Sequence, residues 1–551
     1  MTVLQNNLPP QVVLTSTRAV LTFGEDDLVL TPATITVSPV TGKIVDIVPA
    51  VLPKTSFAAS TVYIDYGSKL LLPGLVDAHV HLNEPGRTEW EGFWTGTRAA
   101  ASGGVTTVVD MPLNAIPPTT TVAGFKEKLA ASQGQCWVDV GFYGGVIPGN
   151  ADELLPLVEA GVRGFKGFLI ESGVDEFPAV SSQDVALAMK TLNGTPTTLM
   201  FHAEMIPPIA DSVGDAVQQS EPPLAPTGEL DSYKTFLESR PPSFETYAVE
   251  EILSLAHLAP DLHLHIVHLS ATQAIPLLKK ARQNGVNITA ETCFHYLGFA
   301  SEDIADGDTR HKCCPPIRER SNRDGLWEEL VAEDSCIKTI VSDHSPCTPQ
   351  LKLLPAHLDV SAVPEQSDAP NMHHSDSGID MTIPGDSVDK MIAEKTLEDA
   401  ALAVADASNR GDFFAAWGGI SSVGLGLPIV HSAAAARVAV DGEGAAPSIV
   451  DIVRLCSQAT AKQVGLGHRK GALKVGMDAD VCVFDDADVW TLRSGDMRWK
   501  NKCSPWEGTE FKGRVRETWV RGRKVFEFGG ENGGFVEGKP VGEPITERRC
   551  A

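Results

Sequence analysis

Between residues 76 and 345, short apolar runs alternate with longer amphipathic stretches. Eight apolar runs occur, at residues 76–82, 106–112, 139–146, 164–169, 198–204, 264–270, 287–293 and 337–345. The stretches between them, such as 151–161 and 245–258, repeat their apolar positions with the period of a helix. This alternation predicts βαβ units and a parallel sheet. Eight such units indicate an α/β protein built on a closed (β/α)₈ barrel, in which catalytic groups lie at the C-terminal ends of the strands.

An open, doubly wound sheet is the alternative arrangement of the same units. That architecture binds dinucleotides through a glycine-rich turn after its first strand. No such turn follows any of the eight runs, and the GLGLP segment at 424–428 lacks the flanking strand and helix that a phosphate-binding loop needs. The barrel is therefore the preferred prediction.

Both ends of the chain have a different pattern. Residues 11–23, 33–48 and 61–74 are β-branched runs broken by Pro and Gly, and residues 470–485 and 515–526 resemble them. We expect these runs to form strands of one small β-sandwich domain assembled from both chain ends. The predicted domains are an N-terminal part (1–72), the barrel (73–470) and a C-terminal part with a tail (471–551).

Residues 349–412 interrupt the barrel pattern directly after the eighth apolar run. This segment has no Phe, Trp or Tyr, and its twelve Asp and Glu against four Lys and Arg give a net charge of −8. We interpret it as an acidic surface insertion. Its first half has the composition of a loop, and its second half has helical spacing.

Composition excludes several functions. The formal net charge of −26 disfavours a nucleic-acid partner, because binding would bring two polyanions together. The chain has no apolar run of about 18 residues and no secretory signal at its start, so we expect a cytoplasmic protein without a membrane partner. Ten cysteines are scattered without a C-x-x-C pair, which agrees with a reducing compartment and no disulfides.

Candidate metal ligands lie near the C-terminal ends of four of the apolar runs. Successive odd residues of a strand share a face, so His79 and His81 present two imidazoles side by side. A pair of hydrogen-bonded core histidines is the simpler interpretation of this motif alone. His202, His268 and Asp343 lie near the ends of the fifth, sixth and eighth runs. Together these residues offer a ligand set that zinc, iron or manganese accepts.

Lys166 lies in the fourth apolar run, where burying an ammonium group is costly and the pKa of the amine should fall. A neutral amine can add carbon dioxide, and the resulting carbamate has two oxygens that could bridge two cations. A lysine that extends to the rim of the barrel is the alternative. Two bridged cations roughly 3.5 to 4 Å apart would activate water at neutral pH and polarise a carbonyl group.

With these motifs in view, the chain resembles the amidohydrolase superfamily over roughly residues 10 to 530, in its branch of dihydroorotases, hydantoinases and allantoinases. The segment HLNEPGRTEWEGFWTGTRAAASGGVTTVVDMPLNAIPPT carries the resemblance most strongly and is most similar to allantoinases. The resemblance implies two divalent metal ions per subunit, zinc first and iron, manganese or cobalt as alternatives, and a homotetramer.

The resemblance also implies a role for each ligand. One ion would be bound by His79, His81 and Asp343, the other by His202 and His268, and N6-carboxylated Lys166 would bridge them. Asp343 would also be the general acid and base. The substrate would be a small molecule, allantoin, opened to allantoate in purine breakdown.

The residue type at the position of Asn83 distinguishes the branches of this superfamily. Dihydroorotases have an Arg two residues after the second histidine, as a partner for the substrate carboxylate. Asn83 cannot neutralise a carboxylate but can pair with the amide groups of a neutral ring, although Arg87 lies only four residues later. Further expected substrate contacts are Asn114, His295, Cys313 and Ser345. For Cys313, loop packing is an equal alternative.

Two other functions remain open. The same metals could serve a hydantoinase, dihydropyrimidinase or dihydroorotase, or the chain could be a scaffold without activity, although no ligand is missing. His263 and His265, which alternate with leucines in LHLHIVH, are interpreted as packing residues or as residues that face the helices.

Overall fold

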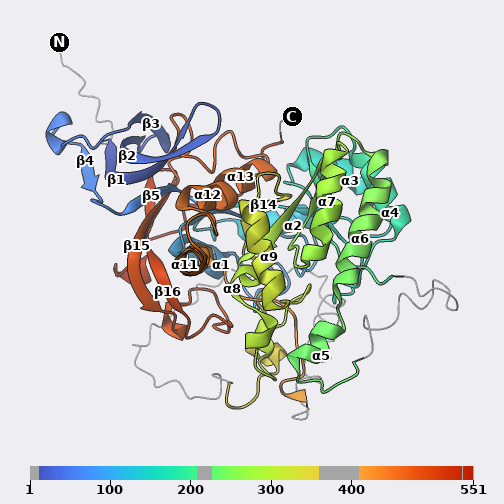
Figure 1. Cartoon of the computed structure of the whole chain (residues 1–551). Coiled ribbons are helices and arrows are strands. Elements are labelled where there is room, and N and C mark those ends of the chain that lie inside the picture. Colours follow the sequence, from blue (N-terminus) through green and yellow to red (C-terminus); the bar gives the residue numbers. More distant parts are fainter. Residues whose placement is uncertain (1–10, 208–225, 359–408, 537, 550–551) are drawn as a thin grey trace, which may run out of the picture.

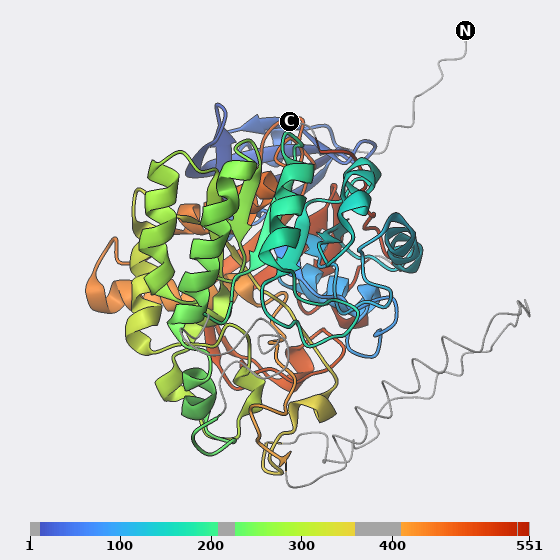
Figure 2. The same cartoon turned by 90° about the vertical axis from the view of Figure 1, so that its right-hand side faces the viewer.

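The computed structural model describes residues 11–207, 226–358, 409–536 and 538–549, and Figures 1 and 2 show its fold in two views. The central part of the chain forms a ring of parallel strands with helices outside. Each of the eight predicted apolar runs contains a strand, and the third run contains two pieces. The strands are β6 (Leu75–Val80), β7 (Val105–Asp110), β8 (Asp139–Phe142), β9 (Gly144–Gly145), β10 (Phe165–Phe168), β11 (Thr198–His202), β12 (His263–Ile266), β13 (Ile288–Cys293) and β14 (Ile337–Val341).

Two parallel sheets make up the ring. One has the order β6-β7-β8 and the other the order β14-β13-β12-β11-β10-β9. The sheets meet at the step from β8 to β9, and they meet again through a parallel bridge between Val80 and His344. At this second junction Asp77 accepts a hydrogen bond from the Ser342 backbone N–H at 3.2 Å. The predicted (β/α)₈ architecture is therefore confirmed.

Helices surround this ring (Figures 1 and 2). Their sequences bury one face: in α4, Val185, Met189 and Leu192 are buried, and Ser181 begins the helix with a capping box to Asp184. The helices of the barrel are α1 (Phe93–Ser102), α2 (Val122–Ser132), α3 (Ala151–Ala160), α4 (Ser182–Leu192), α5 (Tyr233–Glu238), α6 (Pro242–Leu255), α7 (Ile275–Gln283), α8 (Phe294–Gly298), α9 (Arg320–Val331), α11 (Gly426–Asp441), α12 (Ile449–Val453) and α13 (Ala459–Gln463). No helix among the described residues is both long and apolar enough to span a bilayer.

The two chain ends share one sheet, which lies beside the barrel in Figure 1. Its main path runs β17-β16-β15-β5-β1-β2-β3, with β4 paired to β1, and the ends join where β5 pairs antiparallel with β15. The strands are β1 (Val12–Phe23), β2 (Asp27–Ser38), β3 (Lys43–Val48), β4 (Val62–Asp65), β5 (Leu70–Pro73), β15 (Val481–Thr491), β16 (Glu510–Val520) and β17 (Arg523–Glu527). The domain boundaries proposed at residues 72 and 470 stay predictions.

The acidic insertion is described only at its flanks. Residues 349–358 begin with a short 3₁₀ helix (Pro349–Lys352), and residues 409–412 lead back toward the barrel. The remaining residues, 359–408, which include the predicted helical half, lie outside the described part of the chain.

The last described segment returns to the barrel. The carbonyl group of Glu543 accepts a hydrogen bond from the N–H of Val140 at 3.0 Å, and the N–H of Ile545 donates to the carbonyl of Val140 at 2.7 Å. Val140 belongs to β8, so residues 542–546 run along this strand of the ring.

A buried lysine links the barrel to the small sheet. The ammonium of Lys470 lies 2.6 Å from Asp139 of β8, 2.7 Å from Asp480 and 3.0 Å from Asp478. Burial alone would raise the pKa of Asp139, but the charges of Lys470 and Arg521 lower it. The three aspartates form a group that could hold a cation, and the lysine ammonium fills that place.

Replacing this lysine should destabilise the whole protein. In Lys470→Met the buried carboxylates lose a central partner, and we expect a loss of about 3–5 kcal/mol in the free energy of unfolding. Lys462→Met is the matched control, because the Lys462–Asp26 pair is half exposed and should contribute only ~0–1 kcal/mol. Urea unfolding of both variants measures the difference, and equal small losses would contradict the buried link.

Candidate active site

Three of the predicted ligands meet at the junction where the ring closes. His79 lies in β6, His81 directly follows it, and Asp343 follows β14. Oδ1 of Asp343 lies 3.2 Å from Nε2 of His79 and 3.6 Å from Nε2 of His81. These residues form a buried group whose ligand atoms all lie within 4.8 Å of one another.

The other three predicted ligands lie beside this group. Nδ1 of His202 is 3.1 Å from Nε2 of His268, and Nζ of Lys166 is 3.1 Å from Nε2 of His79. The rings of His79 and His268 have centroids 5.4 Å apart, which connects the two groups. The structure therefore brings together all six side chains that the sequence suggested as ligands.

Backbone conformation sets this site apart from the rest of the chain. Only seven described residues other than glycine have a positive φ, and four of them are predicted site residues: Asn83 (61°), Asn114 (64°), His268 (38°) and Asp343 (46°). This region of φ is unfavourable for side chains with a Cβ, and Asn, Asp and His are the types that adopt it most often. Strain of this kind concentrates at functional sites, because the surrounding structure holds it in place.

Burial controls the protonation of the ligands. It lowers the pKa of Lys166 to about 8, against weaker opposing effects from Asp343 and Glu291. It also lowers the pKa of His79 and His268 well below the usual range. Burial alone would raise the pKa of Asp343, but the hydrogen bond with His81 and the charge of Lys166 lower it. At neutral pH the centre therefore offers neutral imidazoles and an ionised carboxylate, which are the forms that bind a cation.

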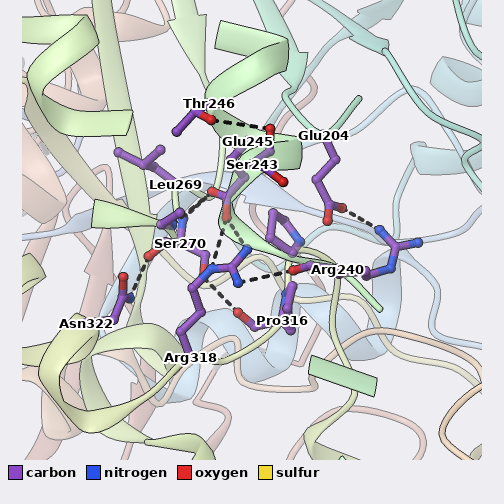
Figure 3. A network of polar contacts seen from close by, with 12 residues as sticks. Glu204, Arg240, Ser243, Glu245, Thr246, Leu269, Ser270, Pro316, Arg318 and Asn322 are labelled. Carbon is purple, nitrogen blue, oxygen red and sulfur yellow. Dashed lines mark hydrogen bonds and ion pairs between the residues drawn. The ribbon is translucent and has the colours of Figure 1, made fainter. Parts of the chain in front are cut away.

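Two buried carboxylates form hydrogen bonds with the rings of His79 and His202, each at the ring nitrogen that faces away from the other ligands. Oε1 of Glu291 lies 2.6 Å from Nδ1 of His79, and Oε2 of Glu204 lies 2.8 Å from Nε2 of His202. Glu204 also pairs with Arg240 at 2.6 Å, as Figure 3 shows. Sequence reasoning did not select these carboxylates, although an acidic residue inside an apolar strand run is itself an indication of function.

A second ion pair in Figure 3 fixes the segment after His268. Glu245 of α6 accepts hydrogen bonds from the backbone N–H groups of Ser270 and Ala271, at 2.9 and 3.0 Å. Its other oxygen pairs with Arg318 at 2.7 Å. The end of β12 is therefore tied to α6, which limits movement of the His268 side chain.

A cavity of about 560 Å³ opens over the ligands. Its lining includes five of the six ligands, the exception being the fully buried His79. Of the predicted substrate contacts, Asn114, Cys313 and Ser345 line this cavity. Asn83 and His295 are not among the lining residues.

The two residues outside the lining have different surroundings. Asn83 donates to the carbonyl of Pro346 at 3.2 Å. His295 is buried with both ring nitrogens lacking a partner, and it groups with Cys293 and Asp343. Arg87 is not free to bind a substrate anion, because it pairs with Glu176 and donates to the carbonyl of Asn114 at 2.8 Å.

One part of the cavity wall was not predicted. Residues 414–419 form it, and two buried lysines hold this segment. Lys312 donates to the carbonyls of Phe414 and Ala416, and Lys352 donates to those of Trp417 and Gly419. Burial lowers the pKa of Lys312 to about 8. No sequence pattern marks these contacts, because they join residues that lie 65 to 104 positions apart in the chain.

The donor set fits divalent cations. Four imidazoles and one carboxylate converge from different strand ends, and Glu291 and Glu204 each accept a hydrogen bond from the ring nitrogen that faces away from the centre. This is the arrangement that orients histidine ligands in metal sites.

The fold and this site define the class of protein. The sequence profile of the Amidohydrolase family matches residues 70–525. In structure, the chain is similar to the L-hydantoinase (dihydropyrimidinase) from Arthrobacter aurescens, with a TM-score of 0.74 and 25% identity, covering 97% of this chain and 99% of that one. The chain belongs to the amidohydrolase family.

Sequence relatives indicate the activity of the chain within this family. The allantoinase of Saccharomyces cerevisiae is 43% identical over 524 residues, which covers 94% of this chain and 96% of that protein. The allantoinase of Streptomyces avermitilis is 37% identical over 530 residues, covering 96% and 97%. Within its family, the chain therefore groups with the allantoinases and is a hydrolase of cyclic amide C–N bonds.

The cavity wall allows a matched pair of variants. Gly419 has a φ of 131°, and a Cβ there would lie 2.2 Å from the carbonyl oxygen of Ser345. At neighbouring Gly418, a Cβ would meet only the sulfur of Cys314, at 4.0 Å. We expect Gly419→Ala to lower kcat/KM for cyclic-amide hydrolysis about 10- to 100-fold by displacing the wall, and Gly418→Ala to change it about twofold at most. Equal kcat/KM values for the two variants would contradict this role of the wall.

Proposed function

We propose that this protein hydrolyses the cyclic amide bond of allantoin to give allantoate. The observation that carries the proposal is the convergence of His79, His81, Lys166, His202, His268 and Asp343 beside one cavity, in a chain 43% identical to a yeast allantoinase. No ligand is missing, which argues against a scaffold without activity.

The ligands support a centre of two divalent cations, with zinc as the first choice. His79, His81 and Asp343 would hold one ion, and His202 and His268 the other. Lys166 lies between the two groups, and its lowered pKa favours the neutral amine that reacts with carbon dioxide. N6-carboxylated Lys166 would then bridge the two ions. When bound, two such ions activate water at neutral pH and polarise the carbonyl that it attacks.

Asp343 would handle the proton in this reaction. It faces the cavity, and its lowered pKa keeps it ionised and able to accept a proton at neutral pH. From the same position it can return the proton to the ring nitrogen as the C–N bond breaks. Asn114, Cys313 and Ser345 line the space where the ring would lie, so they are the first proposed substrate contacts, and Asn83 and His295, which do not line it, are the further ones.

The charges around the cavity support a neutral ring as substrate. Dihydroorotate has a carboxylate, which needs a free cation for binding. Arg87 is paired with Glu176, Arg240 with Glu204, and Lys312 donates to two carbonyls. A ring with ureido and amide groups needs only hydrogen bonds, which backbone and amide groups supply.

The assembly and location remain part of the proposal. A homotetramer follows from the family resemblance, and a cytoplasmic location from the composition. The nine described cysteines are free thiols, in agreement with a reducing compartment.

Turnover of three substrates with metal analysis on the same sample tests the function. We expect two divalent ions per chain and a kcat/KM for allantoin at least about tenfold above those for hydantoin and dihydroorotate. Preference for hydantoin would favour the hydantoinase alternative, and preference for dihydroorotate would favour a dihydroorotase. A preparation with two ions and no turnover of any of the three would support the scaffold.

Lys166→Ala tests the bridging ligand. Without the lysine the two ligand groups lose their proposed bridge, so we expect loss of metal and of nearly all activity. A short carboxylic acid such as acetate or propionate can occupy the space left and supply two oxygens, so its addition should restore part of both. A variant that keeps two ions and full activity without added acid would contradict the carbamate.

A further inference from the structure

A column of hydrogen-bonded side chains runs through the barrel from His79 to a residue near the end of the chain. It begins with the 2.6 Å bond from Nδ1 of His79 to Glu291 and continues from Glu291 Oε2 to Nε2 of His265 at 3.1 Å. The hydroxyl of Thr289 lies 2.7 Å from Nδ1 of His265 and 2.8 Å from Nε2 of His263. The hydroxyl of Thr198 then joins Nδ1 of His263, at 3.1 Å, to Nη1 of Arg549, at 3.3 Å.

His263 and His265 are therefore not simple packing residues. They lie two apart in β12 and face the same way, into the column, because alternate residues of a strand share a face. The C-terminus and α5, which borders the active-site cavity, lie at opposite ends of the barrel in Figure 1. The column thus connects the proposed metal centre to the far end of the ring.

The donor at one end of the column, Arg549, and the ionised carboxylate of Glu291 at the other give its hydrogen bonds one consistent direction. Arginine is always a donor, so the hydroxyl oxygen of Thr198 accepts from Arg549 and donates its own proton to His263. A longer contact, 3.4 Å from the Thr198 hydroxyl to the carbonyl of Gln463, is the weaker alternative for that proton. Burial lowers the pKa of His263 and His265 to about 3, so each ring is neutral and has a single N–H.

Because each ring has one donor and one acceptor nitrogen, the direction of one hydrogen bond sets the direction of the next along the column. His263 accepts at Nδ1 and therefore donates from Nε2 to Thr289. Thr289 then donates to Nδ1 of His265, which donates from Nε2 to Glu291. The carboxylate of Glu291 is left to accept the proton of His79 Nδ1, so that Nε2 of His79 keeps its lone pair.

We propose that the column from Arg549 to Glu291 is a positioning network that fixes His79 in the tautomer required for binding a cation through Nε2. This inference rests on the proposed role of His79 as a metal ligand. His202 has a separate support, because Glu204 holds its Nε2 and is itself fixed by Arg240. The two proposed ions can therefore be disturbed independently.

Glu291→Gln should reverse the tautomer of His79. Glutamine has one acceptor oxygen and one NH₂ group, and the fixed N–H of His265 requires the oxygen on its side. The NH₂ group then faces Nδ1 of His79 and forces the proton of that ring onto Nε2. We expect one of two zinc ions to bind about 10- to 100-fold more weakly than in the unchanged protein.

Adding Thr289→Val should restore the lost affinity. Valine has nearly the shape of threonine but cannot donate, so His265 is free to carry its proton on Nδ1 and accept at Nε2. The amide introduced at position 291 can then turn its oxygen toward His79. We expect the double variant to regain at least about tenfold in zinc affinity over Glu291→Gln, although it contains one more substitution.

Glu204→Gln is the matched control. It also removes a buried carboxylate from a histidine ligand, so it should weaken one zinc ion by a similar factor. The hydrogen bonds of Thr289 go to His263 and His265 and not to Glu204 or His202. Thr289→Val should therefore not restore the zinc affinity of this variant. Rescue of both glutamine variants, or of neither, would overturn the proposal.

The experiment measures zinc affinity by competition with a chromophoric chelator, and stoichiometry by elemental analysis, on the full chain. Glu291→Gln with two ions bound at native affinity would also overturn the proposal. An unchanged protein that binds fewer than two zinc ions would instead contradict the proposed metal centre, which separates the two failures.

A further variant, Glu291→Asp, keeps the experiment decisive if Glu291→Gln does not fold. Aspartate is a poorer fit than glutamine but is still only an acceptor, so it should bind zinc more tightly than Glu291→Gln does. If Glu291→Gln does not fold alone, Glu291→Asp and the double variant decide by themselves. The proposal requires both to hold two ions, and loss of one ion from either would overturn it.

Discussion

The proposed metal centre depends on one constraint: several buried nitrogen atoms must point their lone pairs at the same small volume. Each neutral imidazole has one N–H, and that proton has to be satisfied on the side of the ring away from the centre. Glu291 behind His79 and Glu204 behind His202 meet this requirement, one at Nδ1 and the other at Nε2. The surrounding structure follows from keeping these two carboxylates buried and correctly oriented.

The two carboxylates are kept in place by different means. Burial alone would raise the pKa of Glu204, but Arg240 and His202 lower it to about 2. Glu291 has no arginine partner, and burial raises its pKa to about 8 despite the charge of Lys166. Its ionised form therefore depends on the hydrogen bonds that His79 and His265 donate, and the polar column through the barrel holds the His265 donor in place.

The sequence predicts the centre better than its supports. His79, His81, Lys166, His202, His268 and Asp343 each lie in or at the end of an apolar run, so the period of a strand and the topology of a barrel suffice to bring them together. Glu291 is 212 residues from His79, and nothing in the sequence indicates which ring it holds. The sequence also does not show that the side chains of His263 and His265 point into the barrel, because an inward polar face of a strand has the same pattern as an outward one.

The acidic insertion follows closely after Asp343, whose backbone has a positive φ. The chain leaves the described structure after Leu358 and returns at Asn409. On the two flanks, Gly411 N–H bonds to the carbonyl of Leu353 at 2.6 Å and Trp417 N–H to that of Leu351 at 2.8 Å. The two described ends of the insertion are thus joined to each other and to the cavity wall. Since the entropy of closing a loop grows only slowly with its length, a chain joined at these ends accepts a long insertion at a small cost in stability. The bond from Trp417 to Leu351 also fixes the wall at 414–419 to the segment that follows Asp343.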